Sequence, residues 1–268
     1  MSSLFSAVEL APRDPILGLN EQFAADTHPA KVNLGVGVYY DDNGKLPLLK
    51  CVQAAEKQLA EAPKARGYLP IDGIAAYDNA VKTLVFGADS EPVQSGRVAT
   101  VQALGGTGGL KVGADFLKRL NPSAKVLISD PSWENHRALF INAGFTVETY
   151  PYYDAAKRGI NFEGFIAALQ AAEAGTVVVL HACCHNPTGY DITPEQWDLV
   201  VAAVKERQLV AFLDMAYQGF GYGIAEDGAV IDKFVQAGLT FLVSTSFSKS
   251  FSLYGERVGA LSVLAKDK

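Results

Sequence analysis

The sequence has little of what secreted and membrane-spanning proteins need. It has only three cysteines in 268 residues, of which Cys183 and Cys184 are adjacent and Cys51 is far away. That spacing is not a disulfide framework. No run of about 18 apolar residues could span a bilayer. The first residues lack the basic and apolar regions of a secretory signal. We therefore expect a cytoplasmic protein with no membrane segment.

Positive charge is also scarce. The chain has 23 lysines and arginines against 29 acidic residues, a net charge of −6, and no basic block. A nucleic-acid partner is therefore not expected. Hydrophobic residues make up 49% of the chain and charged residues 19%, so it can bury a sizeable core. Its length suits one large domain or one and a half.

The pattern of the chain changes near residue 47. Residues 1–45 are rich in turn signals and read as an arm with a short strand at 31–34. From there on, helical and apolar strand-like segments alternate. Helices are predicted at 49–61, 75–86, 108–120, 133–143, 162–173, 194–207 and 230–237, and strands at 97–103, 125–129, 145–150, 176–180, 209–213, 241–244 and 257–264. This alternation indicates an α/β fold with an open, mainly parallel sheet and helices on both faces.

Two segments have residues suited to a covalently held, anionic ligand. Gly105, Gly106, Thr107 and the glycines after them join a strand to a helix, where backbone N–H groups can cradle an anion; a plain tight turn is an equal alternative. Lys249 follows an apolar strand and Arg257 comes eight residues later. A buried lysine near another cation has a lowered pKa and can form an imine with an aldehyde, while the arginine grips a phosphate.

Other polar side chains follow predicted strands, where ligands of such sheets bind. Asp214 would be partly desolvated and could pair with a pyridinium N–H, although a strand-end aspartate more often caps a turn. Tyr217 and Asn186 could hydrogen-bond the same ligand, or be an ordinary half-buried tyrosine and a loop residue. Trp133 could stack on an aromatic ring or pack in the core, and His136 could support a buried carboxylate or lie on the surface.

A metal site is not expected. Cys183-Cys184-His185 contains zinc-ligand types, but three consecutive residues do not easily converge on one tetrahedral ion, and no second ligand cluster is visible in the sequence. Buried thiols are the preferred interpretation.

These segments together resemble the pyridoxal-phosphate aminotransferases of the aspartate/aromatic class I group. The matching stretches are 33–39, 68–73, 105–108, 131–136, 183–189, 214–220 and 246–259. The forms of 111–119 and 247–255 look most like the bacterial tyrosine (aromatic amino acid) branch. The resemblance implies the fold type I of these transferases, with a seven-stranded sheet. It implies an N-terminal arm and the start of a small domain at 1–45, and a cofactor-binding large domain at 46–268.

The resemblance also implies a role for each matching residue. Lys249 would hold the cofactor covalently and move a proton, Asp214 would pair with the ring nitrogen, and Tyr217 would complete the catalytic set. The implied cofactor-binding residues are Tyr68, Gly106, Thr107, Trp133, His136, Asn186, Asp214, Tyr217, Ser246, Lys249 and Arg257. Gly37, Trp133 and Asn186 would contact the substrate. Tyr68 would reach the site of a second subunit, which implies a homodimer.

The implied reaction is transamination of aromatic or acidic amino acids with 2-oxo acids such as 2-oxoglutarate. Chains of this family continue past the position of Lys268, so most of the small domain and the arginines that bind substrate carboxylates would lie outside this sequence. Two alternatives remain open at this point. One is a cofactor-binding fragment without turnover, and the other is a different reaction on the same cofactor, such as elimination.

Overall fold

A computed structural model describes residues 4–10, 17–33, 35 and 37–268 of the chain. The chain divides into two units, Met1–Pro47 and Leu48–Lys268. The functional parts assigned to 1–45 and 46–268 stay predictions.

The N-terminal unit contains one helix among its described residues, α1 (Leu17–Ala25). Just after it, the Lys31 ammonium donates to the carbonyls of Phe23 and Asp26, at 2.6 and 2.7 Å. The strand expected at 31–34 does not form at residues 31–33, where the backbone is irregular, and residue 34 lies outside the described residues. Local hydrogen bonds, as at Lys31, take the place of a strand partner.

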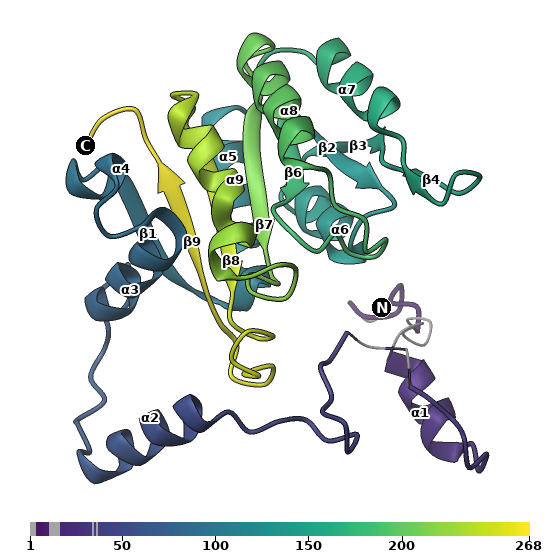
Figure 1. The fold of residues 1–268 in the computed structure, drawn as a ribbon, viewed down its shortest axis with the longest axis vertical. Coiled ribbons are helices and arrows are strands. Elements are labelled where there is room, and N and C mark those ends of the chain that lie inside the picture. The colour runs from purple at the N-terminus through teal and green to yellow at the C-terminus, as the bar shows by residue number, and fades with distance from the viewer. Residues whose placement is uncertain (1–3, 11–16, 34, 36) are drawn as a thin grey trace. The chain divides into compact units, whose positions relative to one another are not determined.

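The second unit is built on one large sheet (Figure 1). Its strands are β1 (Val98–Leu104), β2 (Lys125–Asp130), β3 (Thr146–Pro151), β6 (Val177–His181), β7 (Val210–Met215), β8 (Phe241–Ser246) and β9 (Val258–Leu264). Among the described residues these seven strands pair in the order β1-β9-β8-β7-β6-β2-β3, and only β9 is antiparallel to its neighbours. The predicted seven-stranded, mainly parallel sheet is confirmed. A separate pair, β4 (Tyr153–Asp154) and β5 (Gly159–Ile160), was not expected.

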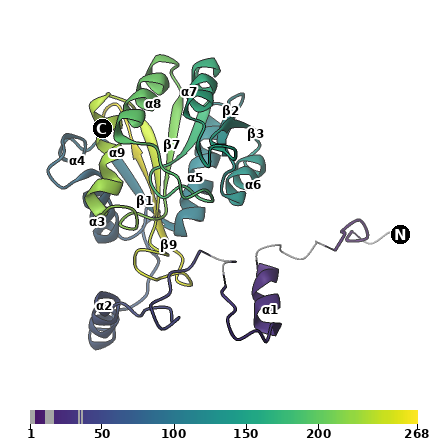
Figure 2. The same cartoon turned by 45° about the vertical axis from the view of Figure 1, so that its right-hand side comes forward.

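Helices cover both faces of this sheet. The helices of this unit are α2 (Lys50–Glu61), α3 (Ala75–Phe86), α4 (Glu91–Gln94), α5 (Gly105–Leu120), α6 (Glu134–Asn142), α7 (Phe162–Ala171), α8 (Pro194–Glu206) and α9 (Ile224–Gln236). Of these, α2 has no buried residue and does not cover the sheet. Figures 1 and 2 show α8 and α9 on one side of the sheet and α5 on the other. Within the described residues, no helix is both long and apolar enough to cross a bilayer.

The core lies in two layers, one on each face. In β7, Ala211 and Leu213 pack in the layer with α8 and α9, whereas Phe212 between them packs with α5 and α6. The side chains on both faces of β7 are buried, and its sequence is therefore a continuous apolar run rather than an alternating one. A capping box starts α8, because Thr193 and Gln196 exchange side-chain and backbone hydrogen bonds.

The topology brings the ends of several strands to one edge of the sheet. The carboxyl ends of β1, β2, β6, β7 and β8 meet there, and β9 begins there because it runs the opposite way. In such sheets the loops at this edge form the ligand site.

Candidate functional site

The start of α5 presents backbone N–H groups at this edge. The helix begins at Gly105, three residues earlier than predicted, and Gly105 adopts a left-handed φ of 69° that favours glycine. Its N–H donates to the Arg257 carbonyl at 2.9 Å. The next N–H groups belong to the first helical turn and have no partner within the helix. They point outward together with the positive end of the helix dipole.

Arg257 and the serines of the β8 end surround the same helix start. A Cβ added at Gly105 would lie 2.7 Å from Nη2 of Arg257, and one added at Gly106 would lie 3.0 Å from Cβ of Ser246. The absence of those carbons is what allows the guanidinium and the serine to approach. Arg257 Nη1 also donates to the Ser248 hydroxyl at 3.4 Å and to the Tyr254 carbonyl at 3.1 Å. Arg257, Ser246 and Thr107 therefore lie where a phosphate group could be held.

A buried carboxylate lies at the end of β7. Asp214 is 6% exposed, and its Oδ2 lies 2.9 Å from Nε2 of His136. His136 is fully buried, and its Nδ1 lies 2.9 Å from the Ser132 hydroxyl. Since both ring nitrogens have partners, the imidazole is fixed. Among described residues, His136 is the one side chain that bonds this carboxylate, so it keeps acceptor capacity for a ligand.

Lys249 lies beside this carboxylate and beside Tyr217. Its Nζ is 4.8 Å from the centroid of the Tyr217 ring. Burial lowers the pKa of Lys249, the charge of Arg257 lowers it further, and Asp214 opposes both effects. Burial, with the charge of Asp214 next, raises the pKa of the Tyr217 phenol. Both shifts favour the uncharged form of the group, and the uncharged amine is the form in which a lysine acts as a nucleophile.

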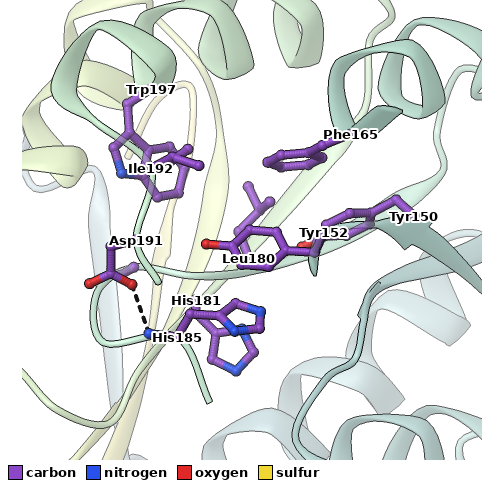
Figure 3. Close-up of a pocket in the computed structure, with 10 residues that line it drawn as sticks. Tyr150, Tyr152, Phe165, Leu180, His181, His185, Asp191, Ile192 and Trp197 are labelled. Atoms are coloured by element: carbon purple, nitrogen blue, oxygen red, sulfur yellow. Dashed lines mark hydrogen bonds between the residues drawn. The ribbon is translucent and has the colours of Figure 1, made fainter. Parts of the chain in front are cut away.

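The loop after β6 carries Asn186 and has a rigid base. The Asp191 carboxylate accepts the backbone N–H groups of Cys184 and His185 at 2.6 and 2.7 Å. Figure 3 shows the contact of Asp191 with His185, and the side chains of His181 and His185 side by side. They border a cavity of about 10 Å³ lined also by Tyr152 and Leu180, a space close to that of one water. Burial lowers the pKa of both imidazoles, that of His185 to about 4.

Two residues that the sequence predicted for the site are not part of the arrangement described above. Tyr68 is fully exposed on the segment before α3, so its contact with a second subunit stays a prediction. Gly37 belongs to the N-terminal unit, so its contact with a substrate stays a prediction. Trp133 is at the site, with its ring 5.4 Å from that of His136 in an edge contact.

Some residues of the site were not singled out from the sequence. Ser132 orients His136, Ser248 bonds Arg257, and Asp191 fixes the Asn186 loop. Ser248 lies in the chain between Ser246 and Lys249, and this position is the one sequence feature that could have indicated its place in the site. Nothing local to Asp191 indicates that it binds the backbone of Cys184.

The chain is similar in sequence and structure to proteins of known function. The family model "Aminotransferase class I and II" matches residues 29–266. An aspartate aminotransferase of Pseudomonas aeruginosa is 64% identical over 99% of this chain and 67% of that protein. An aromatic-amino-acid aminotransferase of Escherichia coli is 51% identical over 98% of this chain and 67% of that protein.

A solved structure gives the same result. The aromatic-amino-acid aminotransferase of Burkholderia pseudomallei, covalently bound to pyridoxal phosphate, superposes with a TM-score of 0.98 at 66% identity, covering 100% of this chain and 67% of that one. With most of its length matched by the family model and a carboxylate, a lysine and an anion-binding helix start at one edge of its sheet, this chain belongs to the class I and II aminotransferases.

Proposed function

We propose that this protein binds pyridoxal phosphate through Lys249 and transfers amino groups between aromatic or acidic amino acids and 2-oxo acids. The observation that carries the proposal is that a half-buried lysine with a lowered pKa lies among three complementary features. These are the Asp214–His136 pair, the Tyr217 ring, and the start of α5 beside Arg257. A similar protein of known structure holds the same cofactor covalently.

The residues present fit the two ends of the cofactor. A protonated pyridine nitrogen suits the buried Asp214 carboxylate, which needs a cationic or N–H partner beyond His136. The phosphate suits the N–H groups of the first turn of α5, together with Thr107, Ser246 and Arg257. Asn186 and Tyr217 would donate to the ring oxygen, Trp133 would cover the ring, and Tyr68 would reach the phosphate in a second subunit.

Lys249 would do two things in this reaction. As a neutral amine it is the nucleophile that attaches the cofactor, and after release it carries the proton to and from the α-carbon of the substrate. When bound, pyridoxal phosphate supplies an electron sink for the negative charge at that carbon. Asp214 would face the ring nitrogen, positioned by its hydrogen bond with His136, which Ser132 orients in turn. Gly37, Trp133 and Asn186 would contact the substrate.

Absorbance and turnover test this function together. Purified protein mixed with pyridoxal phosphate should develop the visible band of a lysine-bound cofactor, and Lys249→Ala should not. Lys266→Ala, which removes an exposed lysine, should behave as the parent. An unchanged band in Lys249→Ala would refute the assignment of Lys249. Turnover of aspartate, tyrosine and phenylalanine with 2-oxoglutarate then ranks the substrates.

A second candidate is cofactor binding without turnover. The chain spans 67% of the length of the relatives it matches, and turnover by these 268 residues is what the experiment decides. The same experiment separates the two functions, because this candidate gives the absorbance band but no 2-oxo acid product. An amino acid with a leaving group on its β-carbon distinguishes elimination from transfer by its product.

We further propose a cytoplasmic homodimer. Tyr68, Ile71 and Leu104 are exposed by 107, 109 and 77%, although all are large and apolar or aromatic. One backbone hydrogen bond, from the N–H of Gln102 to the carbonyl of Asp72 at 2.8 Å, holds the segment around Ile71 beside the end of β1. Such a group suits an interface with a second copy. All three cysteines are free thiols, which suits a reducing compartment.

A further inference from the structure

Two adjacent thiols remain outside the proposed reaction. Cys183 is buried and Cys184 is half-buried, and they follow β6 at the start of the loop that carries Asn186. The Cys184 thiol lies 3.9 Å from the Tyr217 carbonyl, a weak hydrogen bond at most. The proposed reaction gives this buried pair of thiols no role, although thiols can bind metal ions.

The fold adds a carboxylate to these thiols. Asp227, in the first turn of α9, is 5% exposed. Its carboxylate and the two sulfur atoms offer three ligand atoms that all lie within 4.8 Å of one another. The sequence offered His185 as the third ligand, but His185 faces elsewhere: its Nε2 contacts the Ser129 hydroxyl and its Nδ1 the Thr188 hydroxyl.

Backbone hydrogen bonds hold both sides of this cluster. Cys184 has a left-handed φ of 50°, and the N–H bond from it to Asp191 fixes that turn. On the other side, Asp227 Oδ2 accepts the N–H groups of Gly219 and Gly221, and Oδ1 accepts that of Tyr222. Oδ2 therefore has two donors and Oδ1 one, which leaves Oδ1 able to bind a further partner.

The donor set selects a class of ligand. Two sulfurs and one carboxylate oxygen suit a thiophilic divalent cation and not magnesium or calcium, which prefer oxygen. Zinc–sulfur bonds of about 2.3 Å place two sulfurs about 3.8 Å apart in a tetrahedral site. The ligand atoms lie within 4.8 Å of one another, so the two sulfurs need to approach by about 1 Å or less to bind zinc. Side-chain rotation supplies this movement, and a larger soft ion requires a smaller one.

We propose that Cys183, Cys184 and Asp227 form a binding site for one thiophilic divalent cation of the zinc and cadmium class, with water as the fourth ligand. On binding, each thiol releases its proton to solvent and the sulfur binds the ion, so two protons leave for each ion. The two thiolates and the carboxylate bring three negative charges, of which the ion neutralises two. The site does not depend on aminotransferase activity.

Titration with cadmium tests the site directly. The reduced, metal-free chain is titrated with Cd²⁺, and sulfur-to-cadmium charge-transfer absorbance is followed in the ultraviolet. One ion per chain is expected for the parent and for Cys51→Ser, which removes the exposed cysteine. Cys183→Ser and Cys184→Ser should each lose most of the signal. No saturable signal in the parent, or an unchanged one in the variant that combines Cys183→Ser with Cys184→Ser, overturns the proposal.

The carboxylate is tested with a matched pair on α9. Asp227→Asn should weaken Cd²⁺ binding at least about tenfold, because one of three protein ligands is lost. Asp232→Asn, at an exposed position of the same helix, should bind as the parent does. Circular dichroism identifies variants that remain folded, and competition with a zinc indicator extends the measurement to Zn²⁺. Equal affinities in folded Asp227→Asn and Asp232→Asn overturn the three-ligand site.

Discussion

At the residue scale, Lys249 lies between two charges of opposite sign. Burial is the largest cause of its lowered pKa, and Arg257 and Asp214 then act in opposite directions. The net effect favours the neutral amine, because neither a dry surrounding nor a neighbouring guanidinium stabilises an ammonium. The reactivity of this amine should therefore respond to both neighbours, in opposite senses.

The first prediction uses that opposition. Arg257→Gln should raise the pKa of Lys249 and shift its reaction with pyridoxal to higher pH. Asp214→Asn should lower that pKa and shift the reaction to lower pH. The measurement is the rate at which pyridoxal, which lacks the phosphate, is fixed to Lys249 by cyanoborohydride across a pH series. Peptide mapping also measures the modification of Lys118, in the last turn of α5, as an internal control. Shifts in the same direction in both variants would contradict this electrostatic account.

The sequence predicted individual residues best where chemistry and position coincide. Lys249, Asp214 and Arg257 each follow or precede an apolar strand, so the edge of the sheet collects them. Asp227 could not be found this way. Its distance along the chain from Cys183 carries no information about contact, and only the packing of α9 after the loop at Gly219 brings its carboxylate to the thiols.

At the scale of elements, the site depends on the approach of α5 to β9. Gly259 pairs with Ser246 of β8 and Ala103 of β1, and it faces the start of α5. A Cβ added at Gly259 would lie 2.3 Å from the carbonyl carbon of Gly105. The contact is with backbone, which cannot rotate away as a side chain can.

The second prediction follows from this contact. Gly259→Ala should lower the free energy of unfolding by about 3 kcal/mol, because the helix start must move away from the strand. The same movement should weaken inorganic phosphate binding at the helix start. Gly255→Ala is the control: its Cβ would meet no described atom within 4 Å, and its effect should stay within about 0.5 kcal/mol. Urea unfolding measures both, and equal stabilities would argue against a tight α5–β9 contact.

Most elements of the second unit could be predicted from periodicity, but their ends could not. The helix predicted at 230–237 in fact begins at Ile224. The prediction missed its first residues because Glu226 and Asp227 interrupt the apolar pattern there. The helix predicted from 108 begins at Gly105, because glycines conceal a helical turn in what reads as a loop. The strand order has no local signal either, since a pattern of apolar residues does not say which strand pairs with which.

At the scale of the whole molecule, the exposed group at Tyr68, Ile71 and Leu104 makes self-association the expected state. Large side chains that are fully exposed gain more from a partner than from water. Leu104 ends β1 directly before the start of α5, and the backbone bond between Asp72 and Gln102 holds the segment of Ile71 beside the same strand. An interface there would couple assembly to the site.

The third prediction concerns that interface. Ile71→Asp and Leu104→Asp should each weaken self-association at least about tenfold, because a charge would be desolvated in an apolar contact. Leu199→Asp on α8, where the parent leucine is 56% exposed, should leave it unchanged. Sedimentation velocity over a concentration series measures the dissociation constant. A parent protein that stays monomeric at every concentration would remove the basis for a role of Tyr68 in a second subunit.

The central claim is that Lys249 is the lysine that holds the cofactor. The most direct measurement is to mix the protein with pyridoxal phosphate, fix the adduct with borohydride, digest the chain and map the modified peptide by mass spectrometry. The account predicts one pyridoxyl phosphate per chain, on Lys249, and none in Lys249→Arg. Modification spread over exposed lysines with Lys249 untouched, or an equal yield in Lys249→Arg, would contradict it.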